Sequence, residues 1–112
     1  MEIPKRLKIA VTPHHIKVGV CEDPQDCAIA KAVKGQFRGK LTNNAFRDPV
    51  DVDTMVKLRF RGGAMGVYRL TARATRFLTT FDRNKKNAKP QTFLLPLAFG
   101  YDADGMHVQG VV

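Results

Sequence analysis

The chain has 112 residues, of which 44% are hydrophobic and 26% are charged, so it is long enough for a packed core and unlike a disordered protein. We expect a single domain over residues 1–112. No apolar stretch approaches the roughly 18 residues of a membrane span, and the first eight residues are too charged for a secretory signal. Both observations favour a cytoplasmic protein without a membrane partner. Nineteen basic and ten acidic residues give a net charge of +9.

The first third of the chain predicts a strand followed by two helices. Apolar and polar residues alternate over 6–11, which is the period of a strand with one buried face. A threonine and a proline before 14–18, with Gly19 after it, are typical of a short helix that ends in a left-handed residue. Asp23 followed by a proline repeats the capping signal, so we expect a helix over 24–34.

The middle of the chain predicts a loop and then a hairpin. Residues 37–49 are polar and have no period. Residues 56–61 alternate apolar with basic side chains, so one face of this strand is apolar and the other is cationic. Gly62 and Gly63 suit a tight turn, and residues 67–70 return as the second strand.

The register of this hairpin depends on the length of its turn. A three-residue turn pairs Leu58 with Tyr68 and places Arg69 on the cationic face, whereas a two-residue turn places Tyr68 there instead. We favour the three-residue turn because it buries Leu70.

The last third predicts a helix and two further strands. Apolar side chains recur along one stripe from a threonine cap at position 71 to about residue 82. A lysine-rich loop over 83–91 follows, and an apolar strand alternates over 93–99, where Pro96 indicates an edge or a bulge. An Asp-Gly turn at 104–105 precedes a last strand within 106–112.

This order of elements does not alternate as parallel α/β folds do. We therefore expect an α+β fold with a mainly antiparallel sheet of about four to six strands and two helices packed on one face. The predicted core consists of nine apolar side chains: Val56, Leu58, Phe60, Phe77, Leu78, Phe81, Phe93, Leu95 and Leu97.

Two cysteines and two histidines have the side-chain chemistry of a metal site or of a nucleophile with its base. His14, His15, Cys21 and Cys27 are zinc-ligand types, but structural zinc sites bring their cysteines in closer pairs. No acid is placed to orient a catalytic base. We expect free thiols, no cofactor and no enzymatic activity.

The excess charge is concentrated in one segment. Residues 57–89 contain ten basic residues and one acid, whereas the rest of the chain contains nine of each. Such a segment attracts nucleic acid or an acidic protein surface, although basic residues also commonly solvate a sheet. The candidate binding residues are Lys57, Arg59, Arg61, Arg69, Arg73, Arg76, Arg83, Lys85, Lys86 and Lys89.

A set of packing and capping residues carries a resemblance to known proteins. The set comprises His15, Ile16, Gly19, Asp23, Pro24, Cys27, Ile29, Ala30 and Ala32, then Tyr68-Arg69-Leu70, then Phe77 to Asp82. It covers about half of the chain and resembles a group of short uncharacterised proteins from bacteriophages and prophages. The resemblance implies a small accessory protein inside an infected bacterium, but it implies no catalytic or binding residue.

We therefore predict a non-enzymatic accessory protein that contacts the phosphates of DNA or RNA through the basic segment. The alternative is a phage-encoded inhibitor or adaptor, for example against host defence, that binds an acidic host protein surface through the same residues. The sequence leaves the identity of the partner and the oligomeric state open.

Overall fold

The computed structural model describes residues 3–43 and 47–111 and confirms the α+β fold. The elements of this part of the chain are β1 (Arg6–Val11), α1 (Pro13–Val18), α2 (Ala28–Gln36), β2 (Val50–Val52), β3 (Met55–Arg59), β4 (Met65–Arg69), α3 (Ala72–Arg83), the 3-10 helix η1 (Lys85–Asn87), β5 (Gln91–Tyr101) and β6 (His107–Gln109). The strands form one antiparallel sheet in the order β1-β5-β4-β3-β2. β6 pairs with the second half of β5, beyond the residues that pair with β1.

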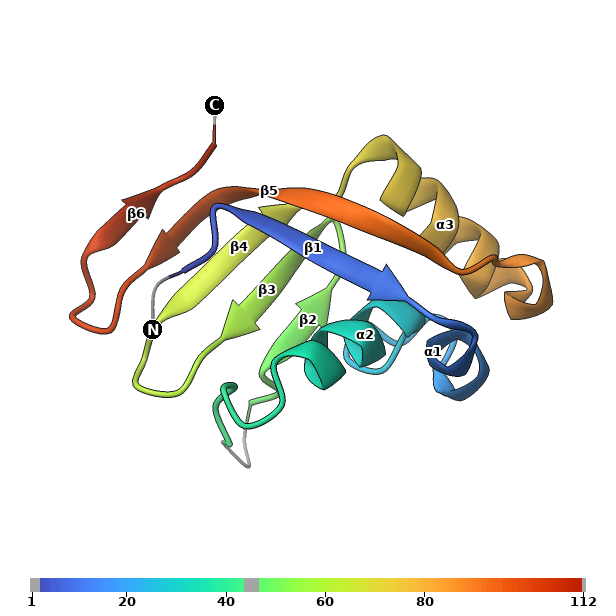
Figure 1. The fold of residues 1–112 in the computed structure, drawn as a ribbon, viewed down its shortest axis with the longest axis horizontal. Coiled ribbons are helices and arrows are strands. Elements are labelled where there is room, and N and C mark those ends of the chain that lie inside the picture. Colours follow the sequence, from blue (N-terminus) through green and yellow to red (C-terminus); the bar gives the residue numbers. More distant parts are fainter. Residues whose placement is uncertain (1–2, 44–46, 112) are drawn as a thin grey trace.

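The sheet is curled, and its inner face is covered by helices (Figure 1). β1 and β2 are at opposite ends of the strand order, yet α2 packs against both. α3 lies along the first half of β5, where Phe77 contacts Phe93 with ring centroids 5.4 Å apart. The helices therefore fill the inside of the curl and leave the other face of the sheet, which we call the outer face, toward solvent.

The predicted core is confirmed. Eight of its nine side chains are less than 5% exposed, and Leu78 is half-buried against the others. Tyr68 joins them fully buried, and its hydroxyl donates a hydrogen bond of 2.8 Å to the carbonyl of Pro4. A Cβ at position 66 would lie 2.8 Å from the Tyr68 ring, so Gly66 is needed to make room for the tyrosine.

The hairpin between β3 and β4 has a three-residue turn, but its register differs from our prediction. Residues 61–63 form the turn, and both glycines have positive φ. Leu58 pairs with Gly66 and not with Tyr68, which is a shift of two residues. Because the shift is even, Tyr68 still points inward and Arg69 outward, as the preferred register required.

The second helix begins later than predicted. The Asp23 carboxylate accepts hydrogen bonds from the backbone N–H groups of residues 25 and 26, at 2.9 and 3.2 Å, and this forms a turn. The Pro24 carbonyl accepts the N–H of Val52 at 2.7 Å, so it is used by the edge of β2. The first helix is confirmed, although Gly19 after it has φ −66° and is not left-handed.

β5 contains a bulge two residues after Pro96, which is one of the two alternatives that this proline indicates, although the alternating pattern does not show it. Leu97 pairs with Tyr68, but Phe99 pairs with the preceding residue, Val67, so Ala98 is an extra residue in β5. The extra residue reverses the alternation. Phe93, Leu95 and Leu97 point inward as predicted, whereas Phe99 points to the outer face, and its predicted place in the same alternating row is wrong.

The remaining elements differ in extent from the sequence-based ones. The three-residue strand β2 was not predicted, because only two valines flank an aspartate. The predicted loop over 37–49 contains a bridge between Leu41 and Phe60, and its residues 44–46 lie outside the described residues. The last strand is restricted to 107–109, and residue 112 is not described.

Candidate nucleic-acid interface

The ten candidate residues occupy three separate places. Six lie on α3, on η1 and in the connection between η1 and β5, and we call the region formed by these elements and the start of β5 the basic corner. Lys57, Arg59 and Arg69 lie on the outer face, and Arg61 lies in the β3–β4 turn. Figure 1 shows this turn at the far end of the molecule from α3. The candidate residues therefore do not form one continuous surface.

The basic corner contains a hollow of about 230 Å³ between α3 and β5. Its lining consists of Arg73, Arg76, Phe77, Thr80, Asn87, Ala88, Lys89 and Gln91. Three cations, a hydroxyl and two amides thus surround a floor of Phe77 and Ala88, and among the described residues no acid lines it. These are hydrogen-bond donors of the kind that bind phosphate oxygens.

The Arg73 side chain is held in place at the edge of this hollow. Its Nε donates to the Gln91 side-chain oxygen at 3.0 Å, and one of its terminal nitrogens donates to the Thr92 carbonyl at 2.8 Å. The guanidinium carbon lies 5.4 Å from the centroid of the Phe93 ring. A guanidinium fixed in this way loses little conformational entropy when it binds an anion.

The cations continue from the hollow along α3. Arg73, Arg76, Thr80 and Arg83 are spaced by three or four residues, so they share one face of the helix. From Arg73 to Arg83 this face extends for about 15 Å at roughly 1.5 Å per residue. It therefore presents an extended row of cations.

Lys85 belongs to the basic corner in position but has a structural contact. Its Nζ donates to the carbonyls of Lys17 and Gly19, at 2.8 and 3.1 Å, and so satisfies the C-terminal end of α1. Lys86, in contrast, is exposed. We therefore separate Lys85 from the residues that are available to a ligand.

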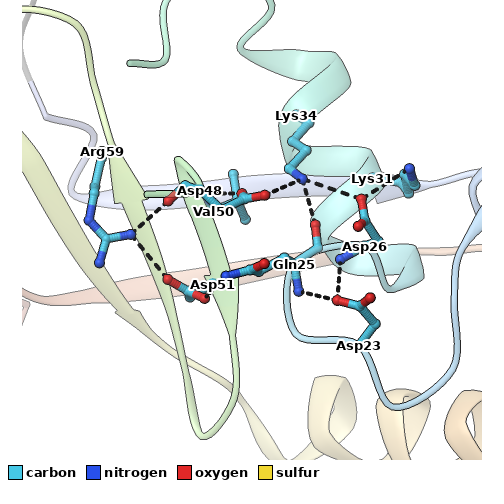
Figure 2. A network of polar contacts seen from close by, with 9 residues as sticks. All are labelled: Asp23, Gln25, Asp26, Lys31, Lys34, Asp48, Val50, Asp51 and Arg59. Atoms are coloured by element: carbon cyan, nitrogen blue, oxygen red, sulfur yellow. Dashed lines mark hydrogen bonds and ion pairs between the residues drawn. The ribbon is translucent and has the colours of Figure 1, made fainter. Parts of the chain in front are cut away.

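Arg59 is also engaged by the protein itself, as Figure 2 shows. One terminal nitrogen of Arg59 donates to the Asp48 carbonyl at 2.8 Å and to the Asp51 carboxylate at 3.0 Å. Its side chain is 18% exposed, and its Nε is buried without a hydrogen-bond partner among the described residues. The cationic face predicted for β3 is thus partly neutralised.

The same network ties α2 to the loop before β2. Lys34 donates to the Gln25 carbonyl at 2.6 Å and pairs with Asp48 at 3.1 Å and Asp26 at 3.4 Å (Figure 2). Lys31 pairs with Asp26 at 3.2 Å. A hollow of about 310 Å³ near this network is lined by Glu22, Asp23, Asp53 and Asp82 among others. These acids therefore gather in one region, and none of them lines the hollow in the basic corner.

The cysteines and histidines do not assemble into a site. Cys27 is buried, which raises the pKa of its thiol, and Cys21 donates to the Phe81 carbonyl at 3.1 Å. His15 caps its own helix together with Thr12. Within residues 3–43 and 47–111, no group of three or more metal-ligating side chains comes together.

Comparison with known proteins leaves the function to be argued from this geometry. No protein-family model matches the chain, and no curated protein or solved structure is significantly similar to it. The resemblance to phage proteins therefore stays a prediction. Across the described part of the chain, every helix is too short or too polar to cross a membrane.

Several residues of the basic corner were not singled out from the sequence. Thr80 could have been found, because it shares the three-to-four residue spacing of the α3 arginines. Asn87 lies on η1 and Gln91 on β5, and only the tertiary packing brings them to the hollow beside α3.

Proposed function

We propose that this protein is a non-enzymatic nucleic-acid-binding accessory protein, acting in the cytoplasm of a phage-infected bacterium, and that the basic corner contacts the phosphates. The observation that carries the proposal is the hollow in which Arg73, Arg76 and Lys89 meet around polar side chains. The row of cations on α3 extends the same surface toward Arg83, so that consecutive phosphates of one strand can be bound.

Binding of this kind rests on neutralisation of phosphates and release of counterions. Affinity then falls steeply as salt concentration rises, with a slope of about −0.7 to −0.9 in logarithmic units per phosphate contact. Phosphate contacts position a nucleic acid without reading its sequence. The basic corner is therefore expected to bind many sequences equally.

Anisotropy titrations with duplex DNA, single-stranded DNA and RNA at two salt concentrations test the proposal. The double variant Arg76→Gln with Lys89→Gln should weaken binding to all nucleic acids that the parent binds and reduce the salt slope by about two. The matched control removes the same two charges elsewhere, at the exposed Lys8 and Lys40, and should have a much smaller effect.

Two results would contradict the proposal. Equal losses in the two double variants would mean that only net charge matters. Parent protein that binds no nucleic acid at either salt concentration would instead favour the inhibitor of an acidic host protein.

A further inference from the structure

The outer face of the sheet carries an exposed aromatic cluster that the core does not use. Phe99, Tyr101 and His107 lie side by side on β5 and β6. The rings of Phe99 and His107 are stacked with centroids 6.5 Å apart, and Tyr101 meets them edge-on at 6.2 and 5.7 Å. Tyr101 is 39% exposed. Three adjacent aromatic rings on a solvent-facing surface are a suitable platform for another flat ring.

The bulge in β5 is what puts these rings on the outer face. If Ala98 were paired as in a regular strand and no bulge were present, Phe99 and Tyr101 would continue the inward row of Leu97, and Gly100 would point outward. A bulge disturbs the hydrogen bonding of a strand, and bulges are often found where a side chain is redirected next to a functional site. The exposure of the cluster therefore follows from the bulge in β5.

A second hollow, of about 410 Å³, adjoins Phe99 on the same face. Its apolar walls include Pro24, Met55, Val67 and Phe99, and its polar lining consists of Asp51, Asp53, Thr54 and Lys57. The Asp51 carboxylate is paired with Arg59 at 3.0 Å. The volume lies within the range of small-molecule pockets, about 300–1,000 Å³. An apolar wall with a few polar groups at the rim fits a nucleobase, whose faces are apolar and whose edges form hydrogen bonds.

Basic side chains adjoin this hollow in the sheet. Lys57 lies directly across from Val67, and Arg69 lies two residues further along β4 on the same face. Arg69 is exposed and donates to the Val111 carbonyl at 3.1 Å. A base in the hollow would thus have cations close to its own phosphate, and the carboxylate of Asp53 and the hydroxyl of Thr54 would be available for hydrogen bonds to the edge of the base.

We propose that the outer face binds unpaired bases of a single-stranded nucleic acid, with one base against Phe99 in the hollow and another on Tyr101. This inference rests on the proposed function, because it assumes that the partner is a nucleic acid. It adds the class of partner: the bases of a duplex are stacked inside the helix and cannot lie on this surface. Stacking on aromatic rings tolerates all bases and favours single strands.

The test compares a mixed-sequence 12-nucleotide DNA strand, an abasic strand of the same length and a 12-base-pair duplex. The abasic strand offers the same phosphates without bases. The parent should bind the normal strand at least about fivefold more tightly than the abasic strand, the lower end of a single stacking contact. Tyr101→Ala should reduce this difference, because one of the two bases loses its ring, and should leave duplex binding unchanged.

Two variants serve as controls. Tyr101→Phe keeps the ring and should bind like the parent, and Leu94→Ala removes an exposed apolar side chain of β5 outside the cluster and should do the same. Because the chain has no tryptophan and only two tyrosines, the difference in tyrosine fluorescence between the parent and Tyr101→Phe reports on Tyr101. The single strand should quench it in the parent and not in Tyr101→Phe, where only the buried Tyr68 remains.

The outcomes separate the two proposals. Equal affinity of the parent for normal and abasic strands, or an unchanged preference in Tyr101→Ala, would overturn the base-binding surface while leaving phosphate binding by the basic corner intact. Weaker binding of every strand by Arg76→Gln with Lys89→Gln, with the preference for the normal over the abasic strand retained at low salt, is expected if both are right. A parent that binds none of the three ligands overturns both.

Discussion

The arginines of β3 and of α3 belong to the same basic segment, but the structure uses them differently. Arg59 is mostly buried and bonded to Asp48 and Asp51, so its charge is neutralised within the protein. Arg76 and Arg83 are exposed on α3, where the neighbouring side chains on the same face are other cations and threonines. The difference teaches that a concentration of charge in the sequence overstates the charge available to a binding partner, because some of the cations are already paired with acids inside the fold.

The largest expected effect comes from detaching α3 and thereby removing the support of the basic corner. Phe81 is fully buried and stacks on Phe77 with centroids 6.3 Å apart. Phe81→Ala should lower the free energy of unfolding by about 3–5 kcal/mol, because it leaves a cavity in the core. Thr75→Ala, on the exposed face of the same helix, is the control and should shift it by less than about 0.5 kcal/mol.

Thermal and urea unfolding measure both variants. A Phe81→Ala protein that unfolds like the parent would mean that α3 does not dock as described, and the hollow in the basic corner would then lose its structural basis.

The second-largest expected effect distinguishes two cations of β3: Arg59, which is bonded within the protein, and Lys57, which is exposed. Arg59→Gln should lower the free energy of unfolding by about 1–3 kcal/mol, because it breaks a charged hydrogen bond and leaves Asp51 without its partner. Lys57→Gln, two residues away and exposed, should change it by less than about 0.5 kcal/mol. Urea unfolding of the two proteins under the same conditions checks this. Equal stability of Arg59→Gln and Lys57→Gln would remove the distinction between the two kinds of cation.

The smallest effect concerns the acids of the network in Figure 2. Burial disfavours the charged form of Asp26, but hydrogen bonding to Lys31 and the charge of Lys34 outweigh it and lower the pKa below its ordinary value of 3.8. A lowered folded-state pKa stabilises the fold above the unfolded value, and this stabilisation is lost as the pH falls through the folded pKa.

Asp26→Asn should therefore destabilise the protein at pH 7 and have less effect near pH 2. The difference should be only roughly a few tenths of a kcal/mol, because the Asp26 side chain is 40% exposed and solvent screens its ion pairs. Urea unfolding at both pH values is the measurement. A destabilisation that grows as the pH falls would contradict the assigned sign.

Much of the fold could be predicted from local patterns, and the exceptions have a physical cause. The alternation over 56–60 and the apolar stripe of α3 identify buried faces directly, since they depend only on the period of each element. The bulge at Ala98 adds one residue without changing residue types, so alternation alone placed Phe99 on the wrong face. The turn after Asp23 looked like a helix cap because the same carboxylate can accept backbone N–H groups in either structure.

The candidate site was less predictable than the fold. Local sequence shows that Arg59 and Arg76 are basic, but the contact of Arg59 with Asp51 depends on β2, which the sequence did not predict. The contact of Lys85 with the end of α1 joins residues that are 68 positions apart in the chain. The hollow likewise requires Gln91 to meet α3. Charge composition therefore identified a basic segment and could not sort its members.

The pairing of β1 with β5 also has a kinetic consequence. Arg6 pairs with Pro96 and Val11 with Gln91, so the partners are 90 and 80 residues apart in the sequence. During synthesis, β1 leaves the ribosome long before its partner, whereas the β3–β4 hairpin and α3 can form from nearby residues. Such distant contacts slow folding, because a long loop must close before they form. We expect Leu7 and Ile9 to stay uncovered on the nascent chain until β5 emerges, which makes this stretch a natural binding site for a chaperone.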